Sequence, residues 1–175
     1  MNLDELALTI YGNPVLRRRA KEVTVFDAEL EALSRRMFEI MYEEEGVGLA
    51  APQAGVSLRM TVMDVPFDDG GSYVGVLVNP EILEHRGEQK GPEGCLSIPG
   101  LREDVVRHQW LRVRAVDLKG RPFEFECTDF LARAVQHEVD HLNGVLYVDR
   151  LSTVRRRLLA KKLKKIAEEQ EAEKK

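Results

Sequence analysis

The chain of 175 residues is long enough for one domain with a hydrophobic core and short for two. Its net charge of −4 argues against a nucleic-acid-binding protein, and DNA is not an expected partner. No apolar run is long enough to span a membrane, and Asp4 and Glu5 interrupt the only early apolar stretch, so neither a membrane protein nor a signal peptide is expected. Two cysteines, Cys95 and Cys127, suit a reducing compartment better than a disulfide framework, which makes the cytoplasm the expected location.

The hydrophobic pattern predicts one helix followed by four strands in the first three quarters of the chain. Residues 27–45 are expected to form an amphipathic helix. Its apolar residues recur at helical spacing: Leu30, Leu33, Met37, Ile40 and Met41. Residues 58–65 and 73–79 have the composition of strands, and residues 111–118 and 122–128 that of a strand pair joined by a lysine–glycine turn.

Three further elements are predicted towards the C-terminus. A helix begins with Asp129 as its N-cap and stops at Asn143-Gly144, and a short apolar segment follows at residues 146–148. Ser152 then caps a last helix. Its apolar side chains are expected on one side, with the three leucines packed onto the body: Val154, Leu158, Leu159, Leu163 and Ile166.

Strands clustered around one central helix predict an α+β fold, with mainly antiparallel sheets packed around that helix and a further helix at the C-terminus. Residues 1–150 are expected to form a single catalytic domain. Residues 151–175 are expected to form a C-terminal helix or tail that is basic at first and acidic from Glu168 to Glu173.

The central predicted helix carries Gln136-His137-Glu138-Val139-Asp140-His141, which contains an H-E-x-x-H motif. Residues four apart lie on one face of a helix, so His137 and His141 would direct two imidazoles at one point, with Glu138 beside them. This arrangement suits a divalent metal held by two nitrogens, with a carboxylate base next to a metal-bound water. A catalytic site of this kind usually has three protein ligands and one open position, so a third ligand is needed.

Several parts of the chain fail as sources of the third ligand. In metzincins it is a histidine three residues after the glycine, but that position here is Tyr147. A glutamate on a later helix is found only at Glu168, Glu169 and beyond, in a polar segment expected to be solvated. His85 and His108 lie among charged residues and are expected to be exposed.

Cys95 is the remaining candidate. It lies in Glu93-Gly94-Cys95-Leu96-Ser97-Ile98-Pro99-Gly100, where glycine and proline predict irregular or extended backbone that can project a side chain. Cys127, within a strand-like segment, is instead expected to be a small core residue. Since Cys-His-His with an open fourth position is an accepted catalytic arrangement, Cys95 joins His137 and His141 as a predicted ligand of one divalent metal. A thiolate suits iron(II), zinc, cobalt or nickel.

The segment Gly46-Val47-Gly48-Leu49-Ala50-Ala51-Pro52-Gln53 contains G-x-G-x-x-A, the spacing of a dinucleotide-binding turn. Its surroundings argue against that use, because it follows a predicted helix ending in three glutamates, which would repel a phosphate. Paired glycines also let a backbone approach a ligand closely, and the side-chain amide of Gln53 could stabilise an oxyanion. A plain connection between a helix and a strand remains the alternative.

These three segments together resemble the peptide deformylases, whose motifs are G-x-G-L-A-A-x-Q, E-G-C-L-S and Q-H-E-x-D-H. All three are complete here, in the family's order and with similar spacing. The segment Ile10-Tyr11-Gly12-Asn13-Pro14-Val15-Leu16-Arg17 also resembles the family's N-terminal segment, and the likeness extends to about Leu151. The resemblance implies a metal-dependent hydrolase that removes the formyl group from the formyl-methionine of newly made polypeptides and releases formate.

The resemblance also implies roles for individual residues. Glu138 would take a proton from the attacking water and deliver it to the departing amine, while the backbone N–H of Leu96 and the side chain of Gln53 would stabilise the oxyanion. The residues expected to contact the substrate are Gly46, Val47 and Gly48. Iron(II) is the metal expected in the cell, and zinc, nickel or cobalt could be present in a purified sample.

Two other classes of protein remain as alternatives. A metallopeptidase that cuts internal bonds is disfavoured by Tyr147 and by the complete cysteine motif. A metal-stabilised binding module would need a fourth protein ligand and would not need Glu138. The last predicted helix is open to two interpretations as well. It is either a solvated helix, or a docking element for the ribosome through its basic first part, which begins with Arg155-Arg156-Arg157.

Overall fold

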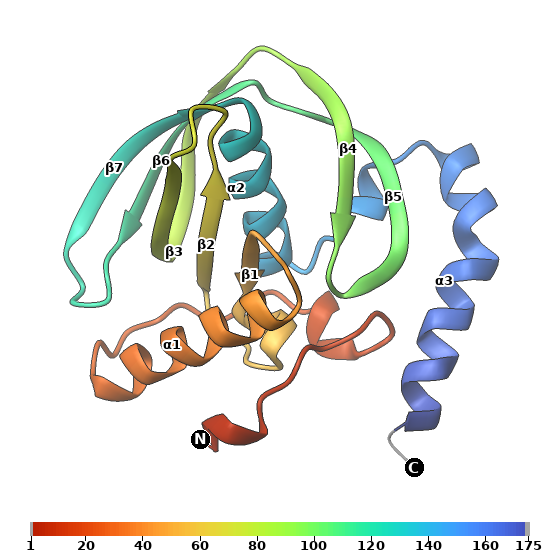
Figure 1. The fold of residues 1–175 in the computed structure, drawn as a ribbon, viewed down its shortest axis with the longest axis horizontal. Helices are drawn as coiled ribbons and strands as arrows, with labels where there is room; N and C mark the ends of the chain where they lie inside the picture. Colours follow the sequence, from red (N-terminus) through yellow and green to blue (C-terminus); the bar gives the residue numbers. More distant parts are fainter. Residues whose placement is uncertain (1, 174–175) are drawn as a thin grey trace.

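A computed structural model describes residues 2–173, which form two antiparallel sheets and three helices (Figure 1). Residue 1 and residues 174–175 of the predicted segments lie outside the described residues. The helices are α1 (Ala28–Glu43), α2 (Asp129–Leu142) and α3 (Thr153–Glu173). The strands are β1 (Gly48–Ala50), β2 (Met60–Pro66), β3 (Ser72–Arg86), β4 (Gln89–Cys95), β5 (Ile98–Arg107), β6 (Trp110–Val116) and β7 (Pro122–Thr128).

The larger sheet has the strand order β1-β2-β3-β6-β7, and each neighbouring pair is antiparallel. β4 and β5 form a separate two-stranded hairpin. Helix α2 lies between the larger sheet and this hairpin, α1 covers the end of the sheet at β1 and β2, and α3 lies against β5 (Figure 1). The predicted α+β fold, with antiparallel sheets around a central helix and a further helix at the C-terminus, is confirmed.

Helix α1 forms where it was predicted and is shorter by two residues at its C-terminal end. The Asp27 carboxylate accepts a hydrogen bond from the Leu30 N–H at 3.0 Å and so caps the first turn. The helix stops at Glu43 because Glu45 takes a left-handed conformation, with φ of 55°, and the Gly46 N–H then bonds back to a carbonyl of the last turn. The predicted apolar face is buried: Leu30, Leu33, Met37, Ile40 and Met41.

The predicted N-cap of α2 was wrong by one residue. Thr128 occupies the N-cap position, and Asp129 is the first helical residue, with φ of 55°. The Asp129 carboxylate accepts a hydrogen bond from the Gln109 side chain rather than from its own helix, which explains why it does not cap. The predicted stop is confirmed: Asn143 is the C-cap, and Gly144, with φ of 74°, leaves no room for a Cβ against the chain before α1.

The strands predicted from alternating apolar residues are present with shifted ends, and β7 agrees at both ends. β3 continues to Arg86, past the predicted end at residue 79. Asn79 is left-handed there, with φ of 50°, and its side-chain amide pairs with the backbone N–H and carbonyl of Val23, so the strand bulges and continues. The β4–β5 hairpin was not predicted, because its glycines, prolines and charges hide any alternation.

Helix α3 is capped as predicted, with the Ser152 hydroxyl accepting from the Arg155 N–H at 3.2 Å. Leu159 and Leu163 are buried against the body, but Leu158 is 65 % exposed and Val154 69 % exposed. The expectation that Leu158 packs onto the body was wrong, because residues 159 and 163 lie on one helix face and residues 154 and 158 on another. Among the described residues, no helix is both long and apolar enough to cross a bilayer.

Candidate metal centre

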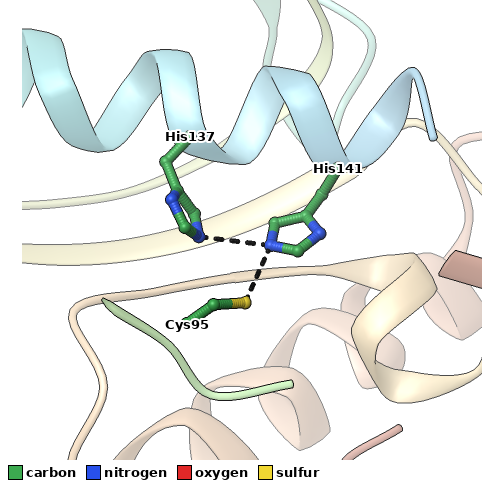
Figure 2. A group of neighbouring side chains, drawn as sticks. All are labelled: Cys95, His137 and His141. Carbon is green, nitrogen blue, oxygen red and sulfur yellow. Dashed lines mark hydrogen bonds between the residues drawn. The ribbon is translucent and has the colours of Figure 1, made fainter. Parts of the chain in front are cut away.

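Cys95, His137 and His141 lie together between the hairpin and α2 (Figure 2). Cys95 is the last residue of β4, and the two histidines project from one face of α2. The Cys95 Sγ lies 3.3 Å from the His141 Nε2, which lies 3.2 Å from the His137 Nε2. The described residues contain no other group of three or more cysteine, histidine or acidic side chains close enough to share a metal ion.

The spacing of these donors fits a tetrahedral divalent metal. Metal–nitrogen bonds of about 2.0–2.1 Å and metal–sulfur bonds of about 2.3 Å place tetrahedral donors roughly 3.3–3.6 Å apart. Burial alone would lower the pKa of His137, but hydrogen bonding to Cys95 and Glu93 outweighs it and raises that pKa well above its usual value. Burial, and then the charge of His137, lower the pKa of His141. Cys95 and Glu93 therefore favour a positive charge at His137.

Glu138 is buried beside the three donors, and its Oε2 has no hydrogen-bond partner among the described residues. Burial is the main reason that its pKa is raised to about 7. Gly48 leaves the space that the Glu138 carboxylate needs, since a Cβ at Gly48 would lie 2.6 Å from the Glu138 Oε1. A carboxyl group that titrates near neutrality can both accept and donate a proton at the same pH.

Gln53 is buried with its amide orientation fixed by its neighbours. Its Oε1 accepts from the Ala50 N–H at 2.9 Å, so its NH₂ group points the other way, donating to the Ser97 Oγ at 3.1 Å and to the Cys95 Sγ at 3.5 Å. Leu96 lies next to Cys95, and a Cβ at Gly46 would meet the Leu96 Cδ1 at 2.6 Å. Each glycine of the first motif thus makes room for a residue of another motif.

A cavity of about 790 Å³ opens beside the donors. One wall is the segment from Glu44 to Gly48, and the other is the hairpin from Pro92 to Arg102. Nearly all the predicted site residues line it: Gly46, Val47, Gly48, Gln53, Cys95, Leu96, His137 and Glu138. His141 is the exception and is buried next to His137.

Glu93 contacts His137 through the ring nitrogen that faces away from the other donors, and this contact was not predicted from the sequence. Its Oε1 accepts from the His137 Nδ1 at 2.9 Å, which leaves the His137 Nε2 free to bind a metal. Burial would raise the pKa of Glu93, but hydrogen bonds from Arg107 and His137 lower it well below its usual value. The only signal in the sequence was the presence of charged residues, such as Arg133, in otherwise apolar or glycine-rich segments.

The side chains that were excluded as metal ligands are exposed or make other contacts. Tyr147 is buried and donates to the Leu101 carbonyl at 3.1 Å. His85 and His108 are exposed as predicted, with their rings stacked 3.8 Å apart. Cys127 is a core residue, and burial raises its pKa to about 12. The glutamates of the tail, at 168 and 169, are exposed and face lysines of α3.

Comparison with known proteins finds the family that the sequence motifs resemble. A family model described as polypeptide deformylase matches residues 6–157. The peptide deformylase of Acidobacterium capsulatum is 48% identical over 156 residues, covering 89% of this chain and 92% of that protein. That of Thermotoga petrophila is 49% identical over 161 residues, covering 91% and 95%.

Solved structures agree with the sequence relatives. The crystal structure of a peptide deformylase from Legionella pneumophila superposes with a TM-score of 0.84 at 44% identity, covering 94% of this chain and 96% of that chain. The structure of the peptide deformylase from Thermus thermophilus gives a TM-score of 0.86 at 39% identity, covering 94% and 99%. Both likenesses extend over almost the whole of each chain.

Proposed function

The chain belongs to the polypeptide deformylase family and is a peptide deformylase, an enzyme that removes the formyl group from an N-terminal methionine, and we propose that it does so with a divalent metal held by Cys95, His137 and His141. The observation that carries this proposal is the grouping of three donors at tetrahedral spacing beside a buried carboxyl group, next to a cavity. Its substrates are newly made polypeptides that begin with formyl-methionine.

The metal is the first part of the proposal. A divalent ion bound there would act as a Lewis acid and lower the pKa of water near it. Of the metals that suit a thiolate and two imidazoles, iron(II) is the one we propose for the cell, from the family resemblance. Zinc, nickel or cobalt could occupy the same donors in a purified sample. We propose the cytoplasm as the location, because iron(II) and the Cys95 thiolate both need reducing surroundings.

Glu138 is the proposed general base and acid. It takes a proton from water as that water attacks the formyl carbonyl, then gives it to the departing amine. Its pKa of about 7, raised by burial, lets it do both near neutral pH. Gly48 supports this role by leaving room for the carboxylate.

Gln53 and the backbone N–H of Leu96 are the proposed donors to the oxyanion. The bond from the Ala50 N–H to the Gln53 Oε1 keeps the NH₂ group of Gln53 directed at the Cys95 Sγ, so little reorganisation is needed as charge develops. The Ser97 hydroxyl accepts from the same NH₂ group and holds it in place. Such a preset donor stabilises the transition state more than the ground state.

Gly46, Val47 and Gly48 are the proposed substrate contacts. β1 begins at Gly48 and lies at the edge of the larger sheet, where β2 is its only strand partner among the described residues. Apart from the Ala50 N–H, which Gln53 occupies, its outer edge could therefore pair with an extended peptide, as an added strand does at a sheet edge. The choice of a formyl group over a longer acyl group rests on family membership alone.

The deciding experiment is a measurement of formate release from a formyl-methionyl peptide. An acetyl-methionyl peptide and a peptide with only internal bonds serve as controls. We expect formate from the first substrate and no cleavage of the other two, with activity lost on chelation and restored by a divalent metal. Full activity in protein shown by elemental analysis to be metal-free would overturn the metal proposal, and cleavage of the internal bonds would favour the peptidase alternative.

We further propose that residues 1–150 hold the catalytic residues and that α3 docks on the ribosome. Two large apolar side chains, Val154 and Leu158, are exposed on α3 among basic residues that include Arg156 and Lys162. The basic side chains of this surface are complementary to RNA phosphates, and its apolar side chains could contact apolar groups of a ribosomal protein beside them.

A further inference from the structure

The carboxylate of Glu93 is saturated with hydrogen bonds. Its Oε1 accepts from the His137 Nδ1 at 2.9 Å and from the Arg107 Nη2 at 2.9 Å. Its Oε2 accepts from the Arg107 Nε at 2.9 Å and from the Arg133 Nη1 at 2.7 Å. An ionised carboxylate can only accept, so the hydrogen between Glu93 and His137 belongs to the Nδ1 of the histidine. The His137 Nε2 is then the nitrogen that faces the other donors.

Arg133 makes further contacts that join three elements. It is 5 % exposed, and from α2 its Nη1 donates to the Val105 carbonyl on β5 at 2.8 Å, while its Nη2 lies 3.4 Å from the Gln89 carbonyl on β4. A Cβ at Gly91 would approach the Arg133 Nη2 to 3.3 Å, so the strand passes close over the guanidinium. One side chain thus ties α2 to both strands of the hairpin that carries Glu93 and ends at Cys95.

The two arginines around Glu93 are not equivalent. Arg107 is shared, because its Nη1 also donates to the Asp140 carboxylate at 2.6 Å. Arg150 binds the same Asp140 at 2.6 Å and 3.0 Å, so this second carboxylate lies between two cations. Arg133 has Glu93 as its only carboxylate partner among the described residues. It is therefore the cation committed to Glu93.

We propose that Arg133 is a positioning residue for the metal ligand His137, acting through the carboxylate of Glu93. By holding the Glu93 Oε2, Arg133 directs the Oε1 at the His137 Nδ1, which fixes the ring and its tautomer. By bonding to Val105 it also holds the hairpin, and hence Cys95, at its distance from α2. The inference rests on the proposed metal site and adds to it a residue that is not itself one of the three metal donors.

The test compares Arg133→Met with Arg36→Met as a matched control. Arg36 is a partly buried arginine of α1 that likewise pairs with a carboxylate and donates to a backbone carbonyl, but away from the site. The first readout is the rate at which bound zinc is lost to a chelator. Loss of a partner behind a metal ligand costs about 10–100-fold. We expect about tenfold faster loss in Arg133→Met, at the low end of that range because Arg107 still holds Glu93, and no change in Arg36→Met.

The second readout is the tautomer of His137 in metal-free protein, from ¹⁵N–¹H correlation spectra at a pH high enough for the ring to be neutral. The neutral wild-type ring should carry its hydrogen on Nδ1, and Arg133→Met should show a mixture of the two tautomers. Unchanged zinc loss together with an unchanged tautomer in Arg133→Met would overturn the proposal, since a merely structural arginine would lower the Tm and leave both readouts as they were.

A double-mutant cycle with Glu93→Gln tests whether Arg133 acts through Glu93. If it does, Arg133→Met should accelerate zinc loss little further once Glu93 is replaced, whereas additive effects would refute that route. Should Arg133→Met fail to fold, Arg133→Lys decides alone. Lysine presents one rotatable ammonium in place of the planar fork and cannot also keep the Nη2 contact to Gln89, so zinc loss faster than in Arg36→Met supports the proposal and an equal rate overturns it.

These readouts separate the inference from the proposed function. A wild-type protein that holds zinc at Cys95 and His137 but releases no formate would refute the function and leave the positioning test valid. Formate release by the wild-type protein, with zinc loss and tautomer unaffected in every Arg133 variant, would refute the positioning role alone.

Discussion

Replacing Glu138 by Gln should lower the activity of the enzyme and raise the stability of the metal-free protein. The variant keeps the shape of the side chain and all three metal donors but cannot take a proton. General acid–base catalysis contributes about 10²–10⁴-fold, so we expect kcat for formate release to fall by about that factor with the metal content unchanged.

The same change should stabilise the metal-free protein. The pKa of Glu138 is raised from 4.5 to about 7, mainly by burial. The folded state therefore keeps a proton that the unfolded state has released, and stability falls as pH rises from the unfolded to the folded pKa. Because a tenfold change in an ionisation constant corresponds to about 1.4 kcal/mol, this ionisation costs about 1 kcal/mol at pH 5 and about 3 kcal/mol at pH 8. Glutamine removes that cost.

Urea unfolding of metal-free wild-type protein and Glu138→Gln at pH 5 and pH 8 measures this directly. We expect the advantage of the variant to grow with pH by about 2 kcal/mol. An advantage of the same size at both pH values would show that Glu138 has an ordinary pKa. A variant that retains a tenth of the wild-type kcat would end its assignment as the general base.

Three other outcomes are expected. Cys95→Ala should lose most of its metal at submicromolar free metal, because two ligands remain; a fully metallated variant with an unchanged spectrum of its cobalt form would place the third ligand elsewhere. Gln53→Leu should lower kcat about 10²-fold, the low end for one oxyanion donor, because a bound metal would polarise the same oxygen. An unchanged kcat/KM would mean that the amide faces away from the chemistry. Reversing two exposed charges of α3, Arg156→Glu with Lys162→Glu, should abolish co-sedimentation with ribosomes at low salt while small formyl-peptides are still hydrolysed. Unaltered co-sedimentation would refute docking through this helix.

The parts of this protein that could be predicted are those specified by local spacing. His137 and His141 could be placed on one helix face because they are four residues apart. Helix α1 and strand β7 could be predicted from the regular spacing of their apolar residues. Cys95 could be selected only because two histidines needed a third donor. The cavity, the raised pKa of Glu138 and the close fit at Gly48 depend on segments that the fold brings together from far apart in the chain.

The failures have equally local causes. The β4–β5 hairpin contains few alternating apolar residues, since it forms a wall of the cavity and places only Ile98, Leu101 and Val105 in the core. Leu158 was assigned to the buried face of α3 because it lies next to Leu159, but neighbours on a helix point about 100° apart. Arg133 could not be given a partner from the sequence, because Glu93 is 40 positions away from it.

The three donors of the candidate metal centre come from a hairpin and a helix. Cys95 and His141 are 46 positions apart, and a covalent bridge over such a span would stabilise a protein by about 4 kcal/mol through the entropy of the unfolded chain. An ion shared by the hairpin and α2 would act in the same sense as a removable cross-link, and the stability that it adds would grow with the free metal concentration. Metal starvation would then loosen the hairpin against the helix. Metal-free enzyme would open there more often than metal-bound enzyme, so the amides of β4 and β5 would exchange faster and the hairpin would be more accessible to proteases.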